Sequence, residues 1–190
     1  MKKIITLLTI AALSTAAFAQ SNWKVDKAHA RVTFTITHMA VSDVDGSFKD
    51  FDASIEASKP DFSDAKFDLS IKTASVNTDN DQRDNHLRSA EFFDAANKPT
   101  LTFVSTKITP TTTNHYKLTG NLTIGGVTKT AAFDLWYRGT ITNPGKPDDA
   151  GFQVTGSIKR SDFNFGSKFG QPVLGDEVTI KANGEFVKQK

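Results

Sequence analysis

Histidine, arginine and carboxylate side chains supply most of the reactive chemistry of this chain, because cysteine is absent from its 190 residues. Without cysteine there is no disulfide, iron–sulfur cluster or thiolate nucleophile. The four histidines, at positions 29, 38, 86 and 115, form no pair with the His-x-x-x-His spacing of a metal site. No serine lies in a Gly-x-Ser-x-Gly sequence, the turn that presents a hydrolytic nucleophile. These residue types therefore predict no metal, no cofactor and no catalytic residue.

Charged side chains gather in the segment Arg83-Asp84-Asn85-His86-Leu87-Arg88. Arg83 could bind an anionic group through its guanidinium, or it could anchor the segment to barrel backbone or to Asp162. Arg160 and Asp162 have the same two possible roles, a ligand contact or a structural one. They lie two residues apart at a predicted strand end and so on one face, which favours a structural ion pair. His38 could donate a hydrogen bond to a hydroxyl, quinone oxygen or phosphate, or it could tie its strand end to the helical connection.

Most of the chain alternates between apolar and polar residues, which is the pattern of half-buried β-strands. Val32, Phe34 and Ile36 alternate with polar side chains, and His38 continues the same parity. Turn sequences such as Gly125-Gly126 separate the alternating runs. The pattern predicts eight main strands, over residues 23–39, 47–57, 65–75, 100–109, 115–124, 129–138, 151–160 and 177–186.

Two regions depart from the alternation. The connection 76–99 is long for a link between strands, and residues 79–88 within it have helical character, with Thr78 or Asp79 as the expected N-cap. Residues 90–94 are expected to form a further helical turn, which gives a short helical insertion around 79–94. The segment 162–175 spaces phenylalanines with glycines and polar residues, and we expect it to form an aromatic loop at one rim.

Strands with one apolar face must bury that face, so the chain closes into a barrel or doubles into a sandwich. An eight-stranded barrel is either filled by its own side chains or holds one small ligand. Inward aromatic residues here alternate with small residues at positions 53, 57, 120, 131, 156, 182 and 184. The small residues either leave an apolar cavity or make room for the phenylalanines of a packed core, and periodicity alone does not separate these possibilities.

The first 19 residues have the features of a secretory signal peptide. Lys2 and Lys3 precede an apolar run over residues 4–12, and Ala17-Phe18-Ala19 forms a small-x-small cleavage signal. We expect residues 20–190 to form one exported domain. The chain has 23 basic and 21 acidic residues, and without Lys2 and Lys3 it carries 21 of each. Nucleic-acid binding is not expected of a nearly neutral domain, and no later segment is apolar enough for stable membrane insertion.

Motifs in a fixed order extend along residues 20–190. They are Trp23-x-Val25-Asp26-x-x-His29, Val32-x-Phe34-x-Ile36-x-His38-Met39, Val44-x-Gly46-x-Phe48, Arg83-Asp84-x-His86-Leu87-Arg88-Ser89, Phe92-Phe93-Asp94, Pro99-x-Leu101-x-Phe103, Gly120-x-Leu122-Thr123-Ile124-x-Gly126-Val127-Thr128-Lys129, Arg160-x-Asp162-Phe163 and Gly175-Asp176-x-Val178. Together they resemble the YceI-like, polyisoprenoid-binding family. Many members have glycine directly after the Arg-x-Asp-Phe motif, where this chain has Asn164.

The resemblance implies an all-β, eight-stranded antiparallel lipocalin-like barrel in the periplasm, holding an isoprenoid or other long-chain lipid and catalysing no known reaction. It favours the hollow barrel. Burial of a methylene recovers about 0.8 kcal/mol, so generic apolar contacts can bind a long tail, and polar groups at the mouth then set specificity. The expected ligand-binding residues are Phe34, Ile36, His38, Phe51, Ile55, Phe67, Leu69, Ile71, Arg83, Leu87, Phe92, Phe103, Leu118, Leu122, Phe133, Leu135 and Ile158.

Three functions are compatible with these observations. The first is a carrier or reservoir for an isoprenoid, a quinone or a fatty amide. The second is an enzyme acting on a lipid-linked substrate, with His38 and an acidic neighbour as its acid–base pair. The third is a non-catalytic envelope or stress protein whose solid barrel binds another protein. Edge strands and rim aromatic residues such as Phe169 could also pair two copies in a homodimer.

Overall fold

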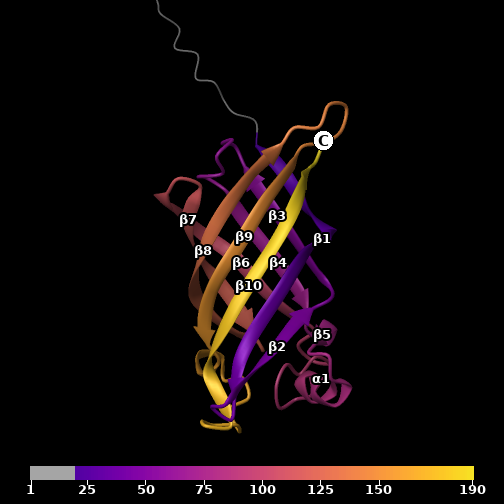
Figure 1. Cartoon of the computed structure of the whole chain (residues 1–190), viewed down its shortest axis with the longest axis vertical. Coiled ribbons are helices and arrows are strands. Elements are labelled where there is room, and N and C mark those ends of the chain that lie inside the picture. The colour runs from indigo at the N-terminus through magenta and orange to yellow at the C-terminus, as the bar shows by residue number, and fades with distance from the viewer. Residues whose placement is uncertain (1–19) are drawn as a thin grey trace, which may run out of the picture.

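A closed antiparallel barrel forms the body of the chain in the computed structural model, which describes residues 20–190 (Figure 1). The strands are β1 (Ser21–His38), β2 (Ser42–Phe48), β3 (Phe51–Ala57), β4 (Lys66–Lys72), β5 (Val76–Asn77), β6 (Thr100–Thr112), β7 (His115–Ile124), β8 (Val127–Ile141), β9 (Asp149–Lys159) and β10 (Leu174–Lys188). Pairing of β10 with β1 closes the sheet. The predicted all-β, eight-stranded antiparallel barrel is confirmed.

Ten strands fill eight positions because two positions are each shared by two strands. The second half of β1 pairs with β2, and its first half pairs with β3. In the neighbouring position β4 pairs with β3, and β5 pairs with β2. The prediction of one continuous strand over 47–57 is therefore wrong: a bend at Lys49 and Asp50 divides it. The two extra residues shift the alternation, so that Phe48 and Phe51 are both buried.

The helical insertion is confirmed as α1 (Asp81–Arg88), which is followed by hydrogen-bonded turns rather than a second helical segment. Asn80 is the N-cap, because its side chain accepts a hydrogen bond from the backbone N–H of Arg83 at 2.9 Å. The predicted cap, Thr78 or Asp79, is wrong. Thr78 is buried and its hydroxyl donates to Asp84, so it is not free to cap the helix.

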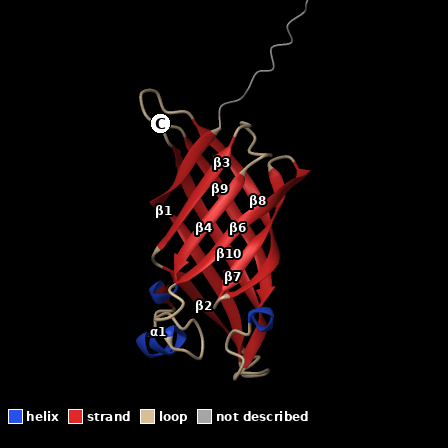
Figure 2. Cartoon of the chain, turned by 180° about the vertical axis from the view of Figure 1, so that it is seen from behind, coloured by secondary structure: helices blue, strands red, loops and turns tan. Residues whose placement is uncertain are grey.

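Two short 3-10 helices, η1 (Thr73–Ser75) and η2 (Arg160–Phe163), complete the described elements. After η2, Asn164 adopts a left-handed backbone conformation with φ 55°. Asparagine tolerates this conformation better than most residues. α1 and the segment 160–174 lie at the same end of the barrel (Figure 2).

The described chain is 20–190, so the signal peptide expected over residues 1–19 lies outside it. Within the described part, no helix has the length and apolar character needed to cross a bilayer. The barrel interior divides along its axis into a filled end and a hollow end. The filled end holds Trp23, Phe62, Tyr137 and Phe152, whose rings contact one another at centroid distances of 5.0–5.4 Å.

Candidate ligand-binding cavity

A cavity of about 430 Å³ occupies the hollow end of the barrel. This volume lies within the usual range of small-molecule pockets, about 300–1,000 Å³. Phe67, Phe152 and Phe186 separate it from the filled end, with centroid distances of 5.5 Å and 5.7 Å between neighbouring rings. The alternation in the sequence was compatible with either a filled or a hollow barrel. In the structure, one end of the barrel is filled and the other end is hollow.

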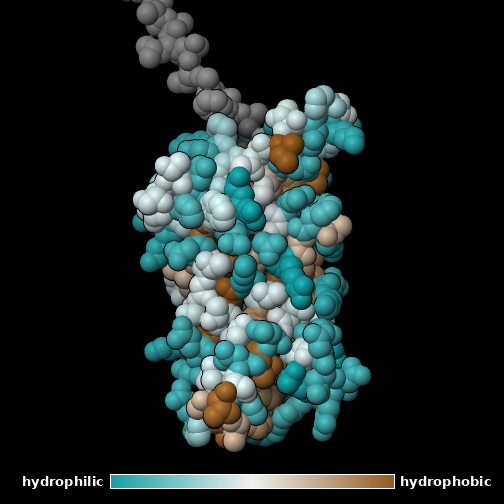
Figure 3. Space-filling view, viewed as in Figure 1, coloured by the Kyte–Doolittle hydropathy of each residue, from teal (hydrophilic) through white to brown (hydrophobic). Residues whose placement is uncertain are grey.

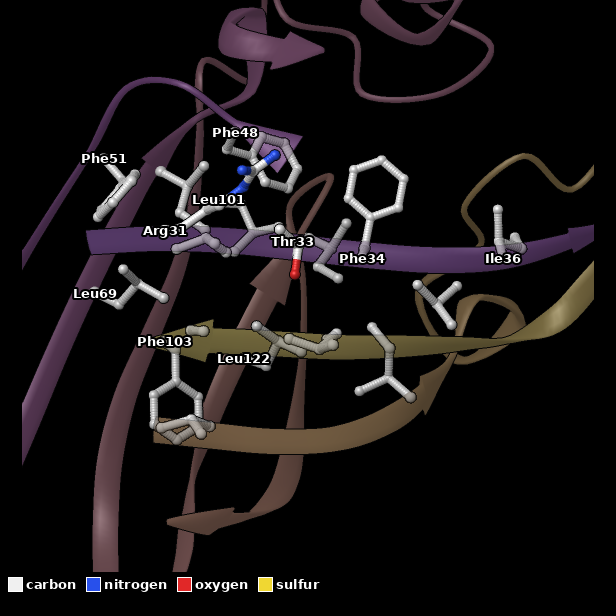
Figure 4. Close-up of a pocket in the computed structure, with 18 of the residues that line it drawn as sticks. Arg31, Thr33, Phe34, Ile36, Phe48, Phe51, Leu69, Leu101, Phe103 and Leu122 are labelled. Atoms are coloured by element: carbon white, nitrogen blue, oxygen red, sulfur yellow. The ribbon is translucent and has the colours of Figure 1, made fainter. Parts of the chain in front are cut away.

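Alternation along the strands builds the cavity wall. Inward residues of β1, β4, β6, β7, β9 and β10 alternate with outward polar ones, and Figure 4 shows apolar side chains from several of these strands around the pocket. The apolar wall residues are Val32, Phe34, Ile36, Phe51, Ala53, Leu69, Ile71, Leu101, Phe103, Leu118, Leu122, Ile124, Phe133, Val154, Ile158, Val178, Ile180 and Ala182. Such a wall offers dispersion contacts and burial to an apolar ligand and few hydrogen bonds.

The structure brings all of the predicted ligand-binding residues to the cavity except Ile55 and Leu135. Those two side chains are fully buried in the core at 0 % exposure, outside the cavity. Ile55 pairs with Trp23 across β3 and β1, and Leu135 pairs with Tyr116 across β8 and β7. Both point inward as the alternation predicts, but they lie at the filled end, and we remove them from the candidate site.

The small inward residues serve both of the purposes that the sequence left open. Ala53, Ala182 and Gly184 line the cavity and leave it space. Gly120 does not, because a Cβ added there would lie 2.5 Å from the ring of Phe103. Gly156 is covered in the same way, because a Cβ added there would lie 2.8 Å from the ring of Phe133. At these two positions glycine makes room for a phenylalanine on the neighbouring strand.

Aromatic side chains from two segments meet at the cavity mouth. Phe92 and Phe93 follow α1, while Phe165 and Phe169 follow η2, and all four line the cavity. The rings of Phe92 and Phe169 stack with 5.1 Å between centroids and 9° between planes. Phe93 and Phe165 are closer still, at 4.6 Å. The aromatic loop expected over 162–175 is present, and with the insertion it forms a cover, which we call the aromatic cover (Phe92, Phe93, Phe165 and Phe169).

Charged groups join the same two segments. Lys168 Nζ donates to Glu91 Oε1 at 2.8 Å, and His86 Nε2 lies 2.7 Å from Glu91 Oε2. The hydrogen bonds from Lys168 and His86 hold the pKa of Glu91 below its ordinary value. The imidazole of His86 also packs edge-on against Phe92, at 5.0 Å. Glu91 is therefore the carboxylate through which α1 and the segment after η2 are held together.

Arg83 is half-buried at the mouth and has a structural role there. Its Nε donates to the Thr78 hydroxyl and its Nη2 to the Thr78 carbonyl, both at 2.7 Å. Asp84, buried at 2 % exposure, accepts from the backbone N–H and hydroxyl of the same threonine. The structural role expected for Arg83 is present, but the anchor is neither barrel backbone nor Asp162: it is Thr78, in the connection between β5 and α1. Arg83 also lines the cavity.

Arg160 is buried and organises the loop that follows it. Its guanidinium donates to the backbone carbonyls of Phe165 and Gly166 at 3.0 Å and 2.9 Å, and also to those of Phe169, Leu174 and Gly175. The expected structural role is present, but the expected ion pair with Asp162 is not: Asp162 is exposed and Arg160 bonds to carbonyl groups. One side chain thus fixes the backbone that carries Phe165 and Phe169.

His38 lies at the cavity mouth, as its parity predicts. It ends β1, where it pairs with Ser42 of β2 and Leu174 of β10. The side chain is exposed, so a ligand group that reaches the mouth could contact it from the solvent side. Neither an acid–base partner nor a bond to the helical connection is present for it among the described contacts of residues 20–190.

Sequence reasoning missed two residues of the barrel interior, one at each end. Phe48 lines the cavity although it has the opposite parity to Phe51 within the predicted strand. The charged pair Lys49-Asp50 between two phenylalanines was the available signal of a phase change. Phe62 was missed as the central ring of the filled end, because it lies in a turn, with φ 58°, where no periodicity marks inward residues.

One group of possible metal ligands occurs in residues 20–190, on the outer surface. Ligand atoms of Asp26, His29 and Glu185 lie within 4.8 Å of one another. His29 Nδ1 is 2.8 Å from Asp26 Oδ2, and this hydrogen bond raises the pKa of His29 and lowers that of Asp26. All three sit where the β1–β10 pairing is irregular, away from the cavity wall. The sequence did not indicate the group, because β10 supplies Glu185 from the other end of the chain.

Comparison with known proteins adds four findings. The family model of the YceI-like domain matches residues 23–186. Protein YceI of Salmonella newport is 37% identical over 194 residues, covering 100% of both chains. The crystal structure of the Campylobacter jejuni YceI protein, 32% identical, superposes with a TM-score of 0.75 and covers 98% of this chain and 100% of that one. A polyisoprenoid-binding domain from Saccharophagus degradans, 15% identical, shares the fold, with a TM-score of 0.68, covering 90% of this chain and 100% of that one.

Proposed function

This chain belongs to the YceI-like family, and from that premise we propose that it binds a long apolar lipid inside its barrel, as a carrier or reservoir. The ligand class is a polyisoprenoid, an isoprenoid quinone or a fatty amide. A domain described as polyisoprenoid-binding shares the fold and gives this class its first support.

The observation that carries the proposal is the composition of the cavity wall. Apolar side chains form most of it, and the polar side chains His38, Thr78, Arg83 and His86 occur at the mouth. The other polar lining residues are Arg160, whose guanidinium is bonded to loop carbonyls, and Arg31, Thr33, Asp68 and Asn183, which alternate along their strands with the inward apolar residues. Each methylene moved from water into such a wall gains about 0.8 kcal/mol, so a tail of many carbons binds without specific contacts. The polar side chains at the mouth would hold the polar end of the ligand.

The filled end gives the ligand a direction. Rings of Trp23, Phe62 and Tyr137 occupy the barrel beyond the cavity floor, which Phe152 helps to form, so a tail can enter only from the end where α1 lies. The aromatic cover lies across this entrance. A ligand bound tail-first would keep its head group near Arg83, His86 and His38.

Export is part of the proposal. The leader-like residues 1–19 would direct the domain to the periplasm, where a lipid with a long tail needs a protein to shield it from water. A carrier or reservoir does not alter its lipid, so the bound lipid should be recovered unchanged after long incubation.

Mass spectrometry of the protein purified from its own envelope tests the proposal. We expect native spectra to show one apolar adduct per chain and organic extracts to yield the same lipid. A folded protein with no stoichiometric extract would overturn the proposal. Conversion of the recovered lipid during incubation, abolished by His38→Ala, would favour the enzymatic alternative.

A matched pair of variants ties the adduct to the cavity. Ala182 faces the cavity from β10, whereas the preceding residue, Lys181, is exposed on the outer face. Ala182→Phe should fill part of the cavity and lower the adduct occupancy. Lys181→Phe adds the same ring outside the barrel and should leave occupancy unchanged. Equal occupancy in both variants would mean that the lipid binds elsewhere.

A further inference from the structure

The end of the barrel that opens to the cavity carries an exposed apolar tip. The turn between β1 and β2 exposes Met39 by 48% and Val41 by 84%, and Val173, just before β10, is exposed by 43%. The backbone N–H of Met39 donates to the carbonyl of Val173 at 3.1 Å, which fixes the two segments side by side. We call Met39, Ala40, Val41 and Val173 the apolar tip. Figure 3 shows hydrophobic residues gathered at this lower end, where Figure 1 places the β1–β2 turn and the start of β10.

The residues of the turn are unsuited to its backbone. The N–H of Val41 bonds to the carbonyl of His38 across Met39 and Ala40, and both of these residues have left-handed φ angles, 54° and 57°. A hairpin turn with two left-handed central residues favours Asn-Gly, since other side chains are strained there. Met39 and Ala40 are therefore not explained by the local fold, and their exposed apolar surface is not explained by packing.

The apolar tip is continuous with the cavity. Val173 lines the mouth together with His38 and Leu174, the residues that pair at the start of β10. An apolar path thus leads from the cavity wall to the outermost side chains of this end.

From this continuity we propose that the apolar tip inserts into the surface of a lipid bilayer and places the cavity mouth against it. This inference rests on the proposed function, because docking would let a lipid pass between bilayer and cavity without crossing water. It is peripheral contact, by a few side chains, and not a membrane span.

A bilayer fits the tip better than a second copy of the chain. Stable protein interfaces bury about 1,200–2,000 Å² in total, which three exposed side chains at a turn cannot supply. A copy seated here would also block the mouth. The carboxylates of Asp43 and Asp45 lie beside the turn on β2, and each accepts a hydrogen bond from a β1 threonine. Negative charge at this position predicts docking driven by apolar contact, on neutral lipid and with little dependence on salt.

Flotation with phosphatidylcholine vesicles tests the docking. The informative variant is Met39→Asn combined with Ala40→Gly, because it removes apolar surface while giving the turn its favoured residues. We expect an equal or higher melting temperature and a vesicle partition lowered by about tenfold. Val41→Ser should also lower the vesicle partition. Ile141→Ser is the matched control: Ile141 is 67% exposed at the opposite end of the barrel, and its loss should leave partition unchanged.

Three outcomes would overturn the inference. The first is that the native chain does not bind vesicles. The second is that Ile141→Ser lowers vesicle partition as much as the Met39/Ala40 variant does. The third is that the native chain forms a concentration-dependent dimer that is absent in the Met39/Ala40 variant. Lipid content measured by mass spectrometry separates this test from the proposed function. A chain that carries lipid but does not float refutes docking alone, and a chain that floats but carries no lipid refutes the cavity proposal and keeps the docking.

Discussion

Glu91 is the residue through which charge acts on the cavity mouth. It bonds to Lys168 in the segment after η2 and to His86 in α1, so one carboxylate joins both halves of the aromatic cover. Exposed ion pairs contribute little to global stability. The Glu91–Lys168 pair, however, connects two segments whose other contacts are aromatic. Its effect should therefore appear in ligand exchange rather than in unfolding.

Replacing Glu91 with Gln should speed ligand release several-fold and leave the urea midpoint almost unchanged. Stopped-flow displacement of a bound fluorescent lipid would measure the release rate. Glu177→Gln, a change at an exposed carboxylate of β10, is the control and should release at the native rate. The same rate in all three proteins would show that the ion pair does not restrain the mouth.

The direction of the Glu91 pKa predicts a pH effect on the same rate. Its folded-state pKa is lowered, by Lys168 first and then by His86, so the ion pair is fully formed above the ordinary carboxyl pKa, about 4.3. It is lost as pH falls through the lowered value. Release should accelerate only on the acid side of that value, and Glu91→Gln should remove the acceleration.

His29 gives a residue-scale prediction away from the cavity. The hydrogen bond with Asp26 raises its pKa above the ordinary value of 6.5. The associated stability is present below 6.5 and is lost as pH rises through the raised folded-state value. NMR titration should find the His29 midpoint above 6.5, and Asp26→Asn should bring it back toward that value. A His29 midpoint at or below the ordinary value in the native chain would contradict the contact.

At the scale of elements, the loop after η2 depends on one buried side chain. Arg160 satisfies five backbone carbonyls between Phe165 and Gly175, and these residues carry part of the aromatic cover. A buried acceptor left without a donor costs about 1–3 kcal/mol. The loop conformation is therefore determined by contacts that sequence neighbours alone do not supply.

Arg160→Met should lower the free energy of unfolding by roughly 3 kcal/mol or more, because it keeps the apolar stem and removes every donor. Arg160→Lys should recover only a part of the lost free energy of unfolding, because an ammonium lacks the planar fork of donors with which the guanidinium reaches five carbonyls. Urea unfolding measures both. Lys159→Met, at the exposed neighbouring position, is expected to change stability by less than about 0.5 kcal/mol. Full recovery by lysine would show that charge, and not geometry, holds the loop.

At the scale of the whole molecule, the barrel combines a core that stabilises the fold with a cavity that weakens it. The filled end buries Trp23, Ile55, Phe62 and Leu135, whereas side chains of the hollow end face empty space. Apolar contacts not made in the cavity are contacts that a ligand can make. Stability and binding are thus assigned to opposite ends of one sheet.

Two phenylalanine truncations should separate these ends. Phe62→Ala removes the central ring of the filled end and should cost about 3–5 kcal/mol of unfolding free energy. Phe34→Ala enlarges an existing cavity and should cost less, below about 2 kcal/mol, while changing ligand occupancy. Urea unfolding and native mass spectrometry give the two readouts. Equal losses of stability would contradict the division of the barrel.

The sequence by itself determined the strands, their inward faces and the insertion, because alternation and turn residues are local properties of the chain. Val32, Phe34 and Ile36 had to share a face, and their inward direction is confirmed by the cavity wall. The ordered motifs indicated the family, and comparison with known proteins confirmed it. Local pattern failed where the chain bends, as at Lys49 and Asp50, and in the turn that carries Phe62.

Only the tertiary structure decided how deep each inward residue lies. Phe51 and Ile55 share the inner face of β3, yet one lines the cavity and the other is part of the filled end. Depth depends on which residues face each other across the barrel, and pairing between β1 and β10, from opposite ends of the chain, sets that register. The same long-range pairing placed Met39 beside Val173. A further contact between distant segments joins Glu91 to Lys168 across the mouth. A period of two fixes the side of the sheet on which a residue lies, whereas its position along the barrel axis requires the closed sheet.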